Sequence, residues 1–446
     1  MHQILMIGAG RSASTAIKYF LDNSQSQHWQ LTIAESDIAL AQKKINGHPN
    51  GKSVLLDATD DAQRKALIAQ HDIVVSLLPP ALHILVAMDC VSLKKNLVTA
   101  SYISAEIQAL HTDALRAGII LMNECGLDPG IDHMSAMRII DDLHHEGCAI
   151  HLFKSYCGGL VAPESNTNPW GYKFTWNPRN VILAGQSMAT FLQNGKQRYL
   201  PFNRIFDDIE QIEIDGMGKW DGYANRDSLS YRTIYRLQHI DTMLRGTLRY
   251  AGYSHAWNIL VQLGYTDDKC VIDNSENMTY AELTEALLPS NATGSTLQDK
   301  VASVMPGKAD KDALEKVAWC GLFENQKIGI KKATPAAALQ KLLEEKWRLN
   351  PGDKDMILMQ HKFEYTDKQQ VGYTLTSDFI LKGDDTTHTA MSKTVGLPLA
   401  ITTKLILQNK IASKGLQLPV TKEFYAPVLD ELQSLGICFV EKTIKK

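Results

Sequence analysis

The sequence predicts an α/β protein: a Rossmann-type, doubly wound parallel sheet plus a mixed α+β sheet domain with a small helical insertion. Three observations support this fold class. Strand-like apolar runs alternate with helical patterns up to about residue 122, which is typical of a parallel sheet. A glycine-rich turn follows the first run directly. From about residue 149 the strand candidates include a hairpin, which indicates a largely antiparallel second sheet.

Composition narrows the classes of function. The chain has 446 residues, enough for about two to four structural units, and a net charge of -3 argues against a nucleic-acid partner. Its seven cysteines form no CxxC pair, so we expect neither a metal site nor a disulfide framework, and reduced thiols suit a cytoplasmic protein. No run approaches the roughly 18 apolar residues of a membrane span, and the first residues show no signal-peptide pattern, so we expect no membrane partner.

The first strand, turn and helix resemble a dinucleotide-binding fingerprint. Ile4–Ile7 is strand-like, the turn reads Gly8-Ala9-Gly10-Arg11-Ser12-Ala13, and a helical pattern follows. In this reading Gly8 permits the tight turn, Gly10 lets backbone N–H groups approach a pyrophosphate, and Ala13 lets the helix pack on the strand. The alternative is an ordinary strand-to-helix turn.

Glu35 bears on the choice of cofactor. It ends the second strand-like run, Trp29–Ala34, where the fingerprint requires an acidic residue. A carboxylate here accepts hydrogen bonds from the ribose hydroxyls and repels a 2′-phosphate, and no Arg or Lys follows directly. The pattern favours NAD, with NADP as the alternative cofactor. The competing interpretation is a solvated acid at a strand end.

Four further runs continue the predicted parallel sheet: Val54–Leu56, Asp72–Leu78, Leu97–Ala100 and Ile119–Met122. Ligands of such sheets bind beyond the carboxyl ends of the strands. The residues at those ends are therefore candidates as a group: Asp57, Leu78, Pro79, Ser101, Tyr102 and Glu124. Pro79-Pro80 must end its strand, because proline has no N–H to donate.

The pattern along the chain predicts three domains. Residues 1–130 form the Rossmann domain, completed by about 390–446, and residues 131–265 and 350–389 form the mixed-sheet domain. Residues 266–349 form the helical insertion, where Thr279-Tyr280-Ala281-Glu282 reads as a capping box and Thr334-Pro335 as another helix start.

The loop Cys125–His133 follows the last parallel strand and carries the first substrate candidate. Gly126, Pro129 and Gly130 make it rigid, and Asp128 is placed to bind an ammonium group or a secondary amine. The alternative is that Asp128 or Asp132 is only a helix cap.

Two later stretches have open interpretations. The four aromatic residues Trp170, Tyr172, Phe174 and Trp176 surround Lys173 in sequence, and they line a pocket or form core beneath a loop. Arginines bind carboxylates through two parallel hydrogen bonds, so three of them would suit a substrate with several carboxylates; the alternative is a surface or ion-pair role for Arg245 or Arg249. These three are Arg226, Arg245 and Arg249.

At these residues the chain resembles the saccharopine dehydrogenase family, in its L-glutamate-forming branch. The matching motifs are Thr99–Ser104, Asn123–His133, Ser155–Leu160, Asn168–Trp176, Asn225–Ser228 and Arg245–Tyr250, with weaker similarity at Met359–Phe363 and Ala390–Ala400. The resemblance covers nearly the whole chain, and these long motifs are far more specific than the glycine fingerprint.

The resemblance implies a nucleotide domain, a mixed-sheet domain used for homodimerisation and a small helical domain. It implies these substrate contacts: Ser101, Tyr102, Asp128, Arg226, Thr247, Leu248 and Arg249. It implies these cofactor contacts: Arg11, Ser12, Asp57, Ala58, Leu78 and Pro79. The chain departs from the family pattern in three places. Glu35-Ser36 replaces the basic residue that fungal, NADP-dependent members carry, Val161 replaces a common proline, and Trp170 replaces a common leucine.

The expected activity is that of an NAD(P)-dependent oxidoreductase acting on a CH–NH group. The family reaction reversibly oxidises saccharopine, through an imine, to L-glutamate and 2-aminoadipate 6-semialdehyde. We expect Asp128 and Tyr102 to handle protons, since the sequence shows no compelling pair of a histidine and a carboxylate. Two alternatives remain: a related imine-forming reductase, such as a polyamine-pathway enzyme, which Trp170 keeps open, and a non-catalytic nucleotide-binding protein.

Overall fold

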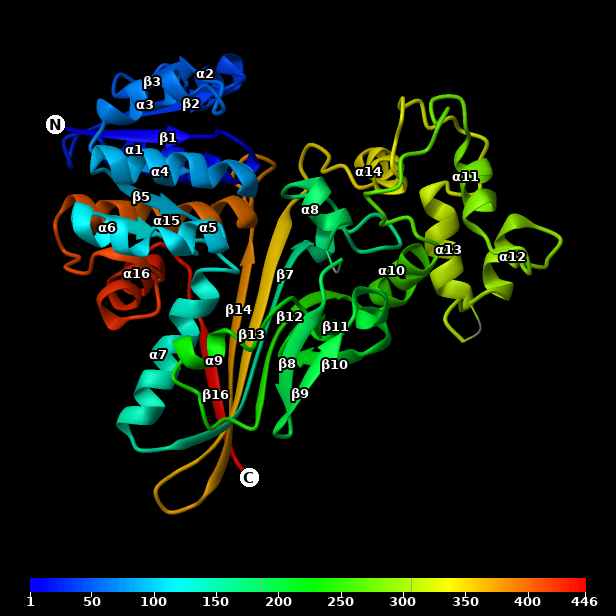
Figure 1. Cartoon of the computed structure of the whole chain (residues 1–446). Coiled ribbons are helices and arrows are strands. Elements are labelled where there is room, and N and C mark those ends of the chain that lie inside the picture. Colours follow the sequence, from blue (N-terminus) through cyan, green and yellow to red (C-terminus); the bar gives the residue numbers. More distant parts are fainter. Residues whose placement is uncertain (185, 306) are drawn as a thin grey trace. The chain divides into compact units, whose positions relative to one another are not determined.

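The computed structural model describes residues 1–184, 186–305 and 307–446. The chain divides into two compact units: unit 1 contains Met1–Cys148 and Leu381–Phe439, and unit 2 contains Ala149–Ile380 and Val440–Lys446. Figure 1 shows that each unit is built around its own sheet. Within the described residues, no helix is long and apolar enough to cross a membrane.

Unit 1 contains a seven-stranded parallel sheet in the order β15-β6-β5-β4-β1-β2-β3, which confirms the Rossmann-type prediction (Figure 1). Its strands are β1 His2–Ile7, β2 Trp29–Glu35, β3 Gly51–Leu55, β4 Ile73–Ser76, β5 Asn96–Thr99, β6 Ile120–Met122 and β15 Gly415–Gln417. Its helices are η1 Arg11–Ala13, α1 Ser14–Asn23, α2 Ile38–Ile45, α3 Asp61–Ala69, η2 Pro80–Leu82, α4 His83–Leu93, α5 Ala105–Ala109, α6 His111–Ala117, α7 Ile131–His145, α15 Ala390–Leu407 and α16 Lys422–Ser434.

The central strands of unit 1 are buried because helices cover them. Ile4–Ile7 of β1 are at most 1% exposed. Helix α15, from the far end of the sequence, packs closely on α1: a Cβ added at Gly396 would lie 2.7 Å from the backbone nitrogen of Ala16. The hydroxyls of Thr15 and Ser392 are 2.5 Å apart across the same contact. The chain therefore returns to the nucleotide domain over Leu381–Phe439.

Unit 2 contains a mixed nine-stranded sheet along β10-β11-β12-β7-β13-β14-β16, with β8 on β12 and β9 on β8. Strand β7 pairs in parallel with β12 and antiparallel with β13. The strands are β7 Ala149–Val161, β8 Ala189–Gln193, β9 Lys196–Leu200, β10 Ile209–Ile214, β11 Gly218–Ala224, β12 Thr242–Tyr250, β13 Asp355–Thr366, β14 Gly372–Lys382 and β16 Val440–Lys445. The helices are η3 Pro163–Ser165, α8 Pro178–Ile182, η4 Phe202–Asp207, α9 Tyr231–Ile234, α10 Tyr253–Gln262, α11 Tyr280–Leu287, α12 Leu297–Ser303, α13 Lys311–Cys320 and α14 Pro335–Lys346.

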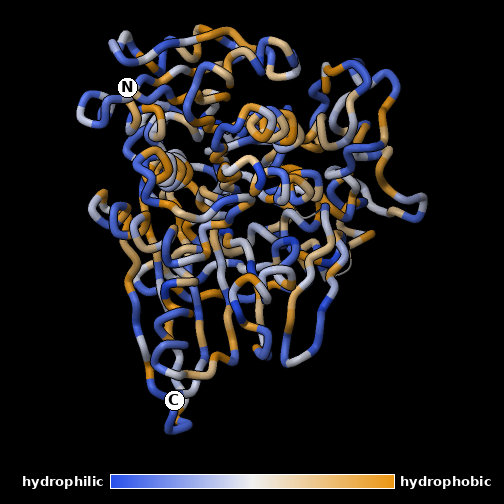
Figure 2. The backbone as a smooth tube through the Cα atoms, turned by 60° about the vertical axis from the view of Figure 1, so that its left-hand side comes forward, coloured by the Kyte–Doolittle hydropathy of each residue, from blue (hydrophilic) through white to orange (hydrophobic). Residues whose placement is uncertain are grey.

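Local sequence signals set several element ends. Thr279 and Glu282 form both halves of the predicted capping box at the start of α11. Thr334 caps α14, whose first residue is Pro335, also as predicted. Figure 2 shows hydrophobic and hydrophilic residues interspersed along the backbone, with continuous hydrophobic stretches such as the buried run Ile4–Ile7 of β1.

The domain boundaries differ from the sequence prediction in three places. Helix α7 belongs to unit 1, not to the sheet domain, because it packs on α16, where Tyr425 Oη donates to Asp141 at 2.7 Å. The last residues, 440–446, belong to unit 2, because β16 pairs with β14. Residues 266–349 do not separate as a unit, because their helices share one hydrophobic core with the sheet.

Candidate functional site

The glycine turn in unit 1 has the geometry that the fingerprint predicts. Gly8 has φ 100°, and a Cβ there would lie 2.8 Å from the carbonyl oxygen of Leu77 at the end of β4. A Cβ at Gly10 would meet nothing within 4 Å, so this side of the turn is open. Ala13 is buried where η1 leads into α1. The open backbone at a helix start fits the pyrophosphate of a dinucleotide.

Glu35 is fixed against this turn. Its Oε2 accepts a hydrogen bond from Ala9 N at 2.6 Å, and its Oε1 accepts from Ser36 N at 2.8 Å and from Ser36 Oγ at 2.9 Å. These hydrogen bonds fix the orientation of the carboxylate and so favour a site residue over a merely solvated acid. The carboxylate lies beside the turn, as a contact to an adenosine ribose requires.

Lys44 is a contact of the turn that the sequence reading missed. From the last turn of α2, its Nζ donates to Gly10 O at 2.5 Å. Burial lowers the pKa of Lys44 to about 8, although the negative charge of Glu35 opposes this shift. The fingerprint places a basic residue directly after Glu35, whereas Lys44 is nine residues further on and approaches the turn because α2 folds back toward it.

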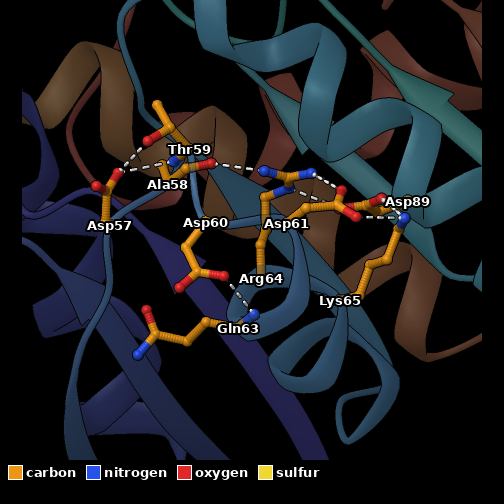
Figure 3. Close-up of polar contacts among 9 residues, drawn as sticks. All are labelled: Asp57, Ala58, Thr59, Asp60, Asp61, Gln63, Arg64, Lys65 and Asp89. Carbon is orange, nitrogen blue, oxygen red and sulfur yellow. Dashed lines mark hydrogen bonds and ion pairs between the residues drawn. The ribbon is translucent and has the colours of Figure 1, made fainter.

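The loop after β3 carries the next cofactor candidates (Figure 3). Asp57 Oδ1 accepts from Thr59 N at 2.8 Å and from Thr59 Oγ1 at 2.7 Å, and these bonds hold the pKa of Asp57 below its usual value. Beneath the loop, the buried Arg64 donates from Nη1 to Ala58 O at 2.7 Å and from Nε to Asp89 Oδ2 at 2.6 Å (Figure 3). Arg64 therefore anchors the loop to α4.

Strand β4 ends before Leu78 and Pro79, and η2 begins at Pro80, as the proline pair predicts. The buried His83 holds this corner through a 2.9 Å contact between its Nδ1 and Ser76 Oγ. Burial lowers the pKa of His83 to about 4, although a hydrogen bond to the backbone of Leu78 opposes the shift.

Backbone hydrogen bonds bring the cofactor candidates together at one edge of the sheet. Leu77 N donates to Ile7 O at 2.9 Å, Gly8 N donates to Ala34 O at 3.0 Å, and Leu56 N donates to Glu35 O at 3.1 Å. The carboxyl ends of β4, β1, β2 and β3 are therefore neighbours. These contacts place the following candidates along one edge: Gly8, Gly10, Arg11, Ser12, Ala13, Glu35, Asp57, Ala58, Leu78 and Pro79.

The ends of β5 and β6 bring Tyr102 and Asp128 together. Cys125 N donates to Thr99 O at 3.1 Å, which joins the two chain segments, and Tyr102 Oη donates to Asp128 Oδ1 at 3.2 Å. Asp132, and not Asp128, serves the start of α7, because its Oδ1 accepts from Gly130 N at 2.6 Å. Of the two readings of Asp128, the geometry therefore supports a site residue.

A histidine–carboxylate pair adjoins the segment that carries Tyr102, so the expectation of no compelling pair was wrong. His133 Nε2 donates to Glu124 Oε2 at 2.8 Å, and both side chains are buried. Glu124 was a candidate only as a strand-end residue. The pair is nine residues apart in sequence and forms because Glu124 adopts φ 56°, a left-handed conformation that the sequence does not signal.

Unit 2 holds the remaining substrate candidates. Arg226 is exposed in a turn after β11, at φ 46°, and the turn is fixed because Thr190 N donates to Arg226 O at 2.8 Å. Asn225 N donates to Arg245 O at 2.9 Å, so this turn lies beside the strand that contains Thr247, Leu248 and Arg249.

Arg249 is a buried guanidinium in unit 2. It is 5% exposed, and its guanidinium carbon lies 5.1 Å from the ring centre of Tyr172 and 5.5 Å from that of Tyr253. Nη1 donates to Leu248 O at 2.8 Å, whereas Nε has no hydrogen-bond partner among the described residues. In the described part of the chain no carboxylate lies within ion-pair distance of it. The surface and ion-pair readings of Arg249 are therefore wrong.

Arg245 is buried too, and its guanidinium lies 4.4 Å from the ring centre of Tyr231. It therefore packs within unit 2, so the surface alternative is also wrong for this arginine.

The aromatic stretch around Lys173 is core. Trp170 is 1% exposed, its Nε1 donates to Lys316 O at 2.9 Å, and its ring packs edge-on against Trp257 and Trp347. Lys173 Nζ pairs with Asp353 Oδ2 at 2.6 Å, so its charge is neutralised inside the unit. The substitution at Trp170 therefore changes the packing of unit 2. No cluster of metal-ligating side chains occurs among the residues that the structure describes.

Two family models match the chain. The saccharopine dehydrogenase NADP binding domain matches residues 4–122, and the saccharopine dehydrogenase C-terminal domain matches residues 126–437.

Curated relatives match over the full chain. The protein of Schizosaccharomyces pombe named saccharopine dehydrogenase (NADP(+), L-glutamate-forming) is 32% identical, with 100% of this chain and 99% of that protein covered. The protein of the same name from Saccharomyces cerevisiae is 34% identical, with 99% of each covered. The bovine protein named mitochondrial alpha-aminoadipic semialdehyde synthase is 35% identical over 99% of this chain, but only 48% of that protein is covered.

A solved structure shows the same fold. The apo histidine-tagged saccharopine dehydrogenase (L-Glu forming) from Saccharomyces cerevisiae superposes with a TM-score of 0.87 and 33% identity, covering 100% of both chains. The resemblance read from the motifs of the sequence is thus confirmed independently by family models, by relatives of matching length and by the fold. The chain belongs to the saccharopine dehydrogenase family.

Proposed function

We propose that the protein is an NAD(P)-dependent oxidoreductase that converts saccharopine to L-glutamate and 2-aminoadipate 6-semialdehyde, reversibly. One observation carries this proposal: the chain matches proteins named as L-glutamate-forming saccharopine dehydrogenases over 99% or more of both lengths. The paired Tyr102 and Asp128 at the carboxyl edge of the parallel sheet support it, because this edge is where such folds bind their ligands.

The overall reaction consumes saccharopine, oxidised cofactor and water, and it yields the two products, reduced cofactor and a proton. The bound nicotinamide supplies a hydride acceptor in this direction. The substrate nitrogen must be unprotonated before a C=N bond forms, because the bond uses its lone pair. We assign the removal of that proton to the pair of Asp128 and Tyr102. The hydroxyl of Tyr102 donates to Oδ1 of Asp128, which leaves Oδ2 of Asp128 as the stronger acceptor. Water then splits the C=N bond.

The substrate class agrees with the arginines of unit 2. Saccharopine has three carboxylates, and Arg226 and Arg249 are the guanidinium groups we assign to them, with Ser101, Thr247 and Leu248 as further contacts. The support is the buried Arg249, whose Nε lacks a hydrogen-bond partner among the described residues. A buried cation without a counter-charge is costly unless a ligand supplies an anion.

The cofactor is a nicotinamide dinucleotide, and we propose a preference for NAD over NADP. The support is the carboxylate of Glu35, which is held against the glycine turn and would repel a 2′-phosphate. The fungal relatives carry NADP(+) in their names. A preference for NAD would therefore distinguish this chain from those relatives, and Lys44 is the cation beside the turn that favours NADP as the alternative.

We also propose that the protein acts as a cytoplasmic homodimer with its mixed sheet at the interface, since the family resemblance implies dimerisation and scattered cysteines suit a reducing compartment. Two observations argue against the rival functions. Trp170, which kept a related imine-forming reductase open, is buried core, and the Tyr102–Asp128 pair argues against a non-catalytic nucleotide-binding protein.

The test is direct. Purified protein with saccharopine and NAD should produce the absorbance of reduced nicotinamide, with L-glutamate as a product identified by mass spectrometry. A parallel assay with NADP ranks the two cofactors, and spermidine serves as an amine control. Release of lysine and 2-oxoglutarate, or turnover without glutamate, would refute the assigned reaction.

A further inference from the structure

Three ionisable side chains lie buried together, hydrogen-bonded to the chain segments that carry Tyr102 and Asp128. Glu124 is 3% exposed, Asp132 is 2% exposed and His133 is 0% exposed. His133 Nε2 donates to Glu124 Oε2 at 2.8 Å, and His133 Nδ1 lies 3.7 Å from Asp132 Oδ2. Burying charged groups is costly, so a cluster of this kind is tolerated only when its members bond one another or the backbone.

Glu124 joins the two chain segments that carry the proton-handling pair. Its Oε1 accepts from Ile103 N at 3.2 Å, directly after Tyr102, and its own backbone N donates to Ser101 O at 3.0 Å, directly before Tyr102. Glu124 thus forms hydrogen bonds with the residues on both sides of Tyr102. Its φ of 56° directs the chain into the loop that holds Asp128.

His133 and Asp132 hold the other end of the same loop. Both are on α7, and Asp132 Oδ1 accepts from Gly130 N at 2.6 Å. Gly130 cannot be replaced without moving the loop, because a Cβ there would lie 2.1 Å from Gly126 O. The bond from His133 to Glu124 therefore ties the helix to the start of the loop, while Asp132 ties it to the end.

We propose that His133 and Glu124 are positioning residues: their hydrogen bond sets the separation of Tyr102 and Asp128, and through them the alignment of the substrate nitrogen. This inference rests on the proposed function for its catalytic readout. Reaction rates are sensitive to such alignment, because a displacement of about 1 Å can cost on the order of a hundredfold. Neither residue touches the substrate in this account.

Matched variants separate positioning from general stability. His133→Leu removes the N–H donor at similar volume, whereas His133→Gln keeps an amide N–H near the position of Nε2. His71→Leu is the control, because His71 is also buried in unit 1 and bonds through Nδ1 to Leu67 O at 2.6 Å, but it precedes β4 at the amino end of the sheet.

We expect His133→Leu to lower kcat for saccharopine oxidation about 10- to 100-fold, with the Kd of NADH from fluorescence titration within about twofold of the wild type. His133→Gln should recover most of this loss, and His71→Leu should keep kcat within about twofold. A crystal structure of His133→Leu should show Tyr102 Oη and Asp128 Oδ1 no longer within hydrogen-bond distance.

Three results would overturn the inference: a kcat of His133→Leu equal to that of His71→Leu, an equal loss in His133→Gln, or an unchanged Tyr102–Asp128 distance in the crystal. If the wild type does not oxidise saccharopine, the proposed function fails, whereas the crystallographic distance still decides whether His133 positions the pair.

Discussion

Glu35 and Lys44 bring opposite charges to one glycine turn, because one accepts from Ala9 N and the other donates to Gly10 O. In the proposed preference for NAD, single residues at this turn decide between the two cofactors. The carboxylate is at the strand end, where we expect it to repel a 2′-phosphate, whereas the ammonium comes from α2 and binds the backbone.

Removing that carboxylate should change the cofactor preference. In Glu35→Ala with Ser36→Arg, the repulsion disappears and a cation follows the strand, so the ratio of kcat/KM for NADP to that for NAD should rise. Glu35→Gln is the control, since it removes the charge alone. Initial rates with each cofactor measure the ratio, and a wild type that already favours NADP would refute the role given to Glu35.

Arg226 is expected to bind a substrate carboxylate. A hydrogen bond to a charged group contributes roughly 1.5–3 kcal/mol, so Arg226→Ala should lower kcat/KM for saccharopine about 10- to 100-fold. The Kd of NADH should hardly change. Arg204→Ala, which removes an exposed guanidinium elsewhere in unit 2, is the control. Equal losses in turnover and NADH binding would place Arg226 in the fold or the cofactor site.

His83 should make unit 1 sensitive to acid. Burial lowers the pKa of His83 to about 4 in the folded protein, whereas the ordinary pKa of a solvated histidine is 6.5. Between these pH values the unfolded chain binds a proton that the folded chain does not, so stability falls as the pH drops from 6.5 to 4. The unfolding temperature of His83→Gln should fall less over this range than that of the wild type. The exposed His145→Gln should follow the wild type; equal slopes for all three proteins would exclude His83.

At the scale of elements, the contact between α1 and α15 holds the glycine turn in place. Replacing glycine by alanine inside a helix normally stabilises it by roughly 1 kcal/mol. Gly396 on α15 is an exception, because its Cβ would lie 2.7 Å from Ala16 N and 3.2 Å from Ala16 Cβ.

Gly396→Ala should therefore destabilise the protein by about 1–3 kcal/mol, as overpacking does, and lower its unfolding temperature. It should also weaken NADH binding, since α1 follows the turn directly. Gly372→Ala is the matched control, because its nearest neighbours would be at 3.6 Å or more. A higher unfolding temperature for Gly396→Ala would show that the two helices can separate without cost.

Elements with local signals could be predicted from the sequence, whereas contacts between distant segments could not. The turn at Gly8, the end of β4 at Pro79-Pro80 and the cap at Thr279 each depend on a few neighbouring residues. The aromatic stretch at Trp170 allowed two readings, since only packing against α13 shows that it is core. Helix α7 was assigned to the wrong domain, because its partner α16 lies almost 300 residues later.

The candidate site divides in the same way. The strand-end rule located Asp57, Tyr102 and Glu124, because the carboxyl ends of parallel strands share an edge. The rule could not predict the hydrogen bond from His133 to Glu124, because that bond depends on the left-handed backbone conformation of Glu124. It also could not predict the contact of Lys44 with Gly10, because that contact depends on how α2 packs against the turn.

At the scale of the whole molecule, the chain passes between its two units three times, after Cys148, Ile380 and Phe439. The final passage returns only Val440–Lys446, yet these residues supply β16, which pairs with β14 along six residues, from Asp378 to Tyr373.

The order of synthesis follows from that final passage. The edge of the sheet in unit 2 stays open until β16 has been made, after the parallel sheet of unit 1 has received its final strand at Gly415–Gln417. The exposed hydrogen-bonding groups of β14 must then remain unpaired on a nascent chain, where open strand edges favour aggregation. Deletion of Val440–Lys446 would leave this edge of β14 open in the finished protein, so we expect the shortened protein to aggregate more readily.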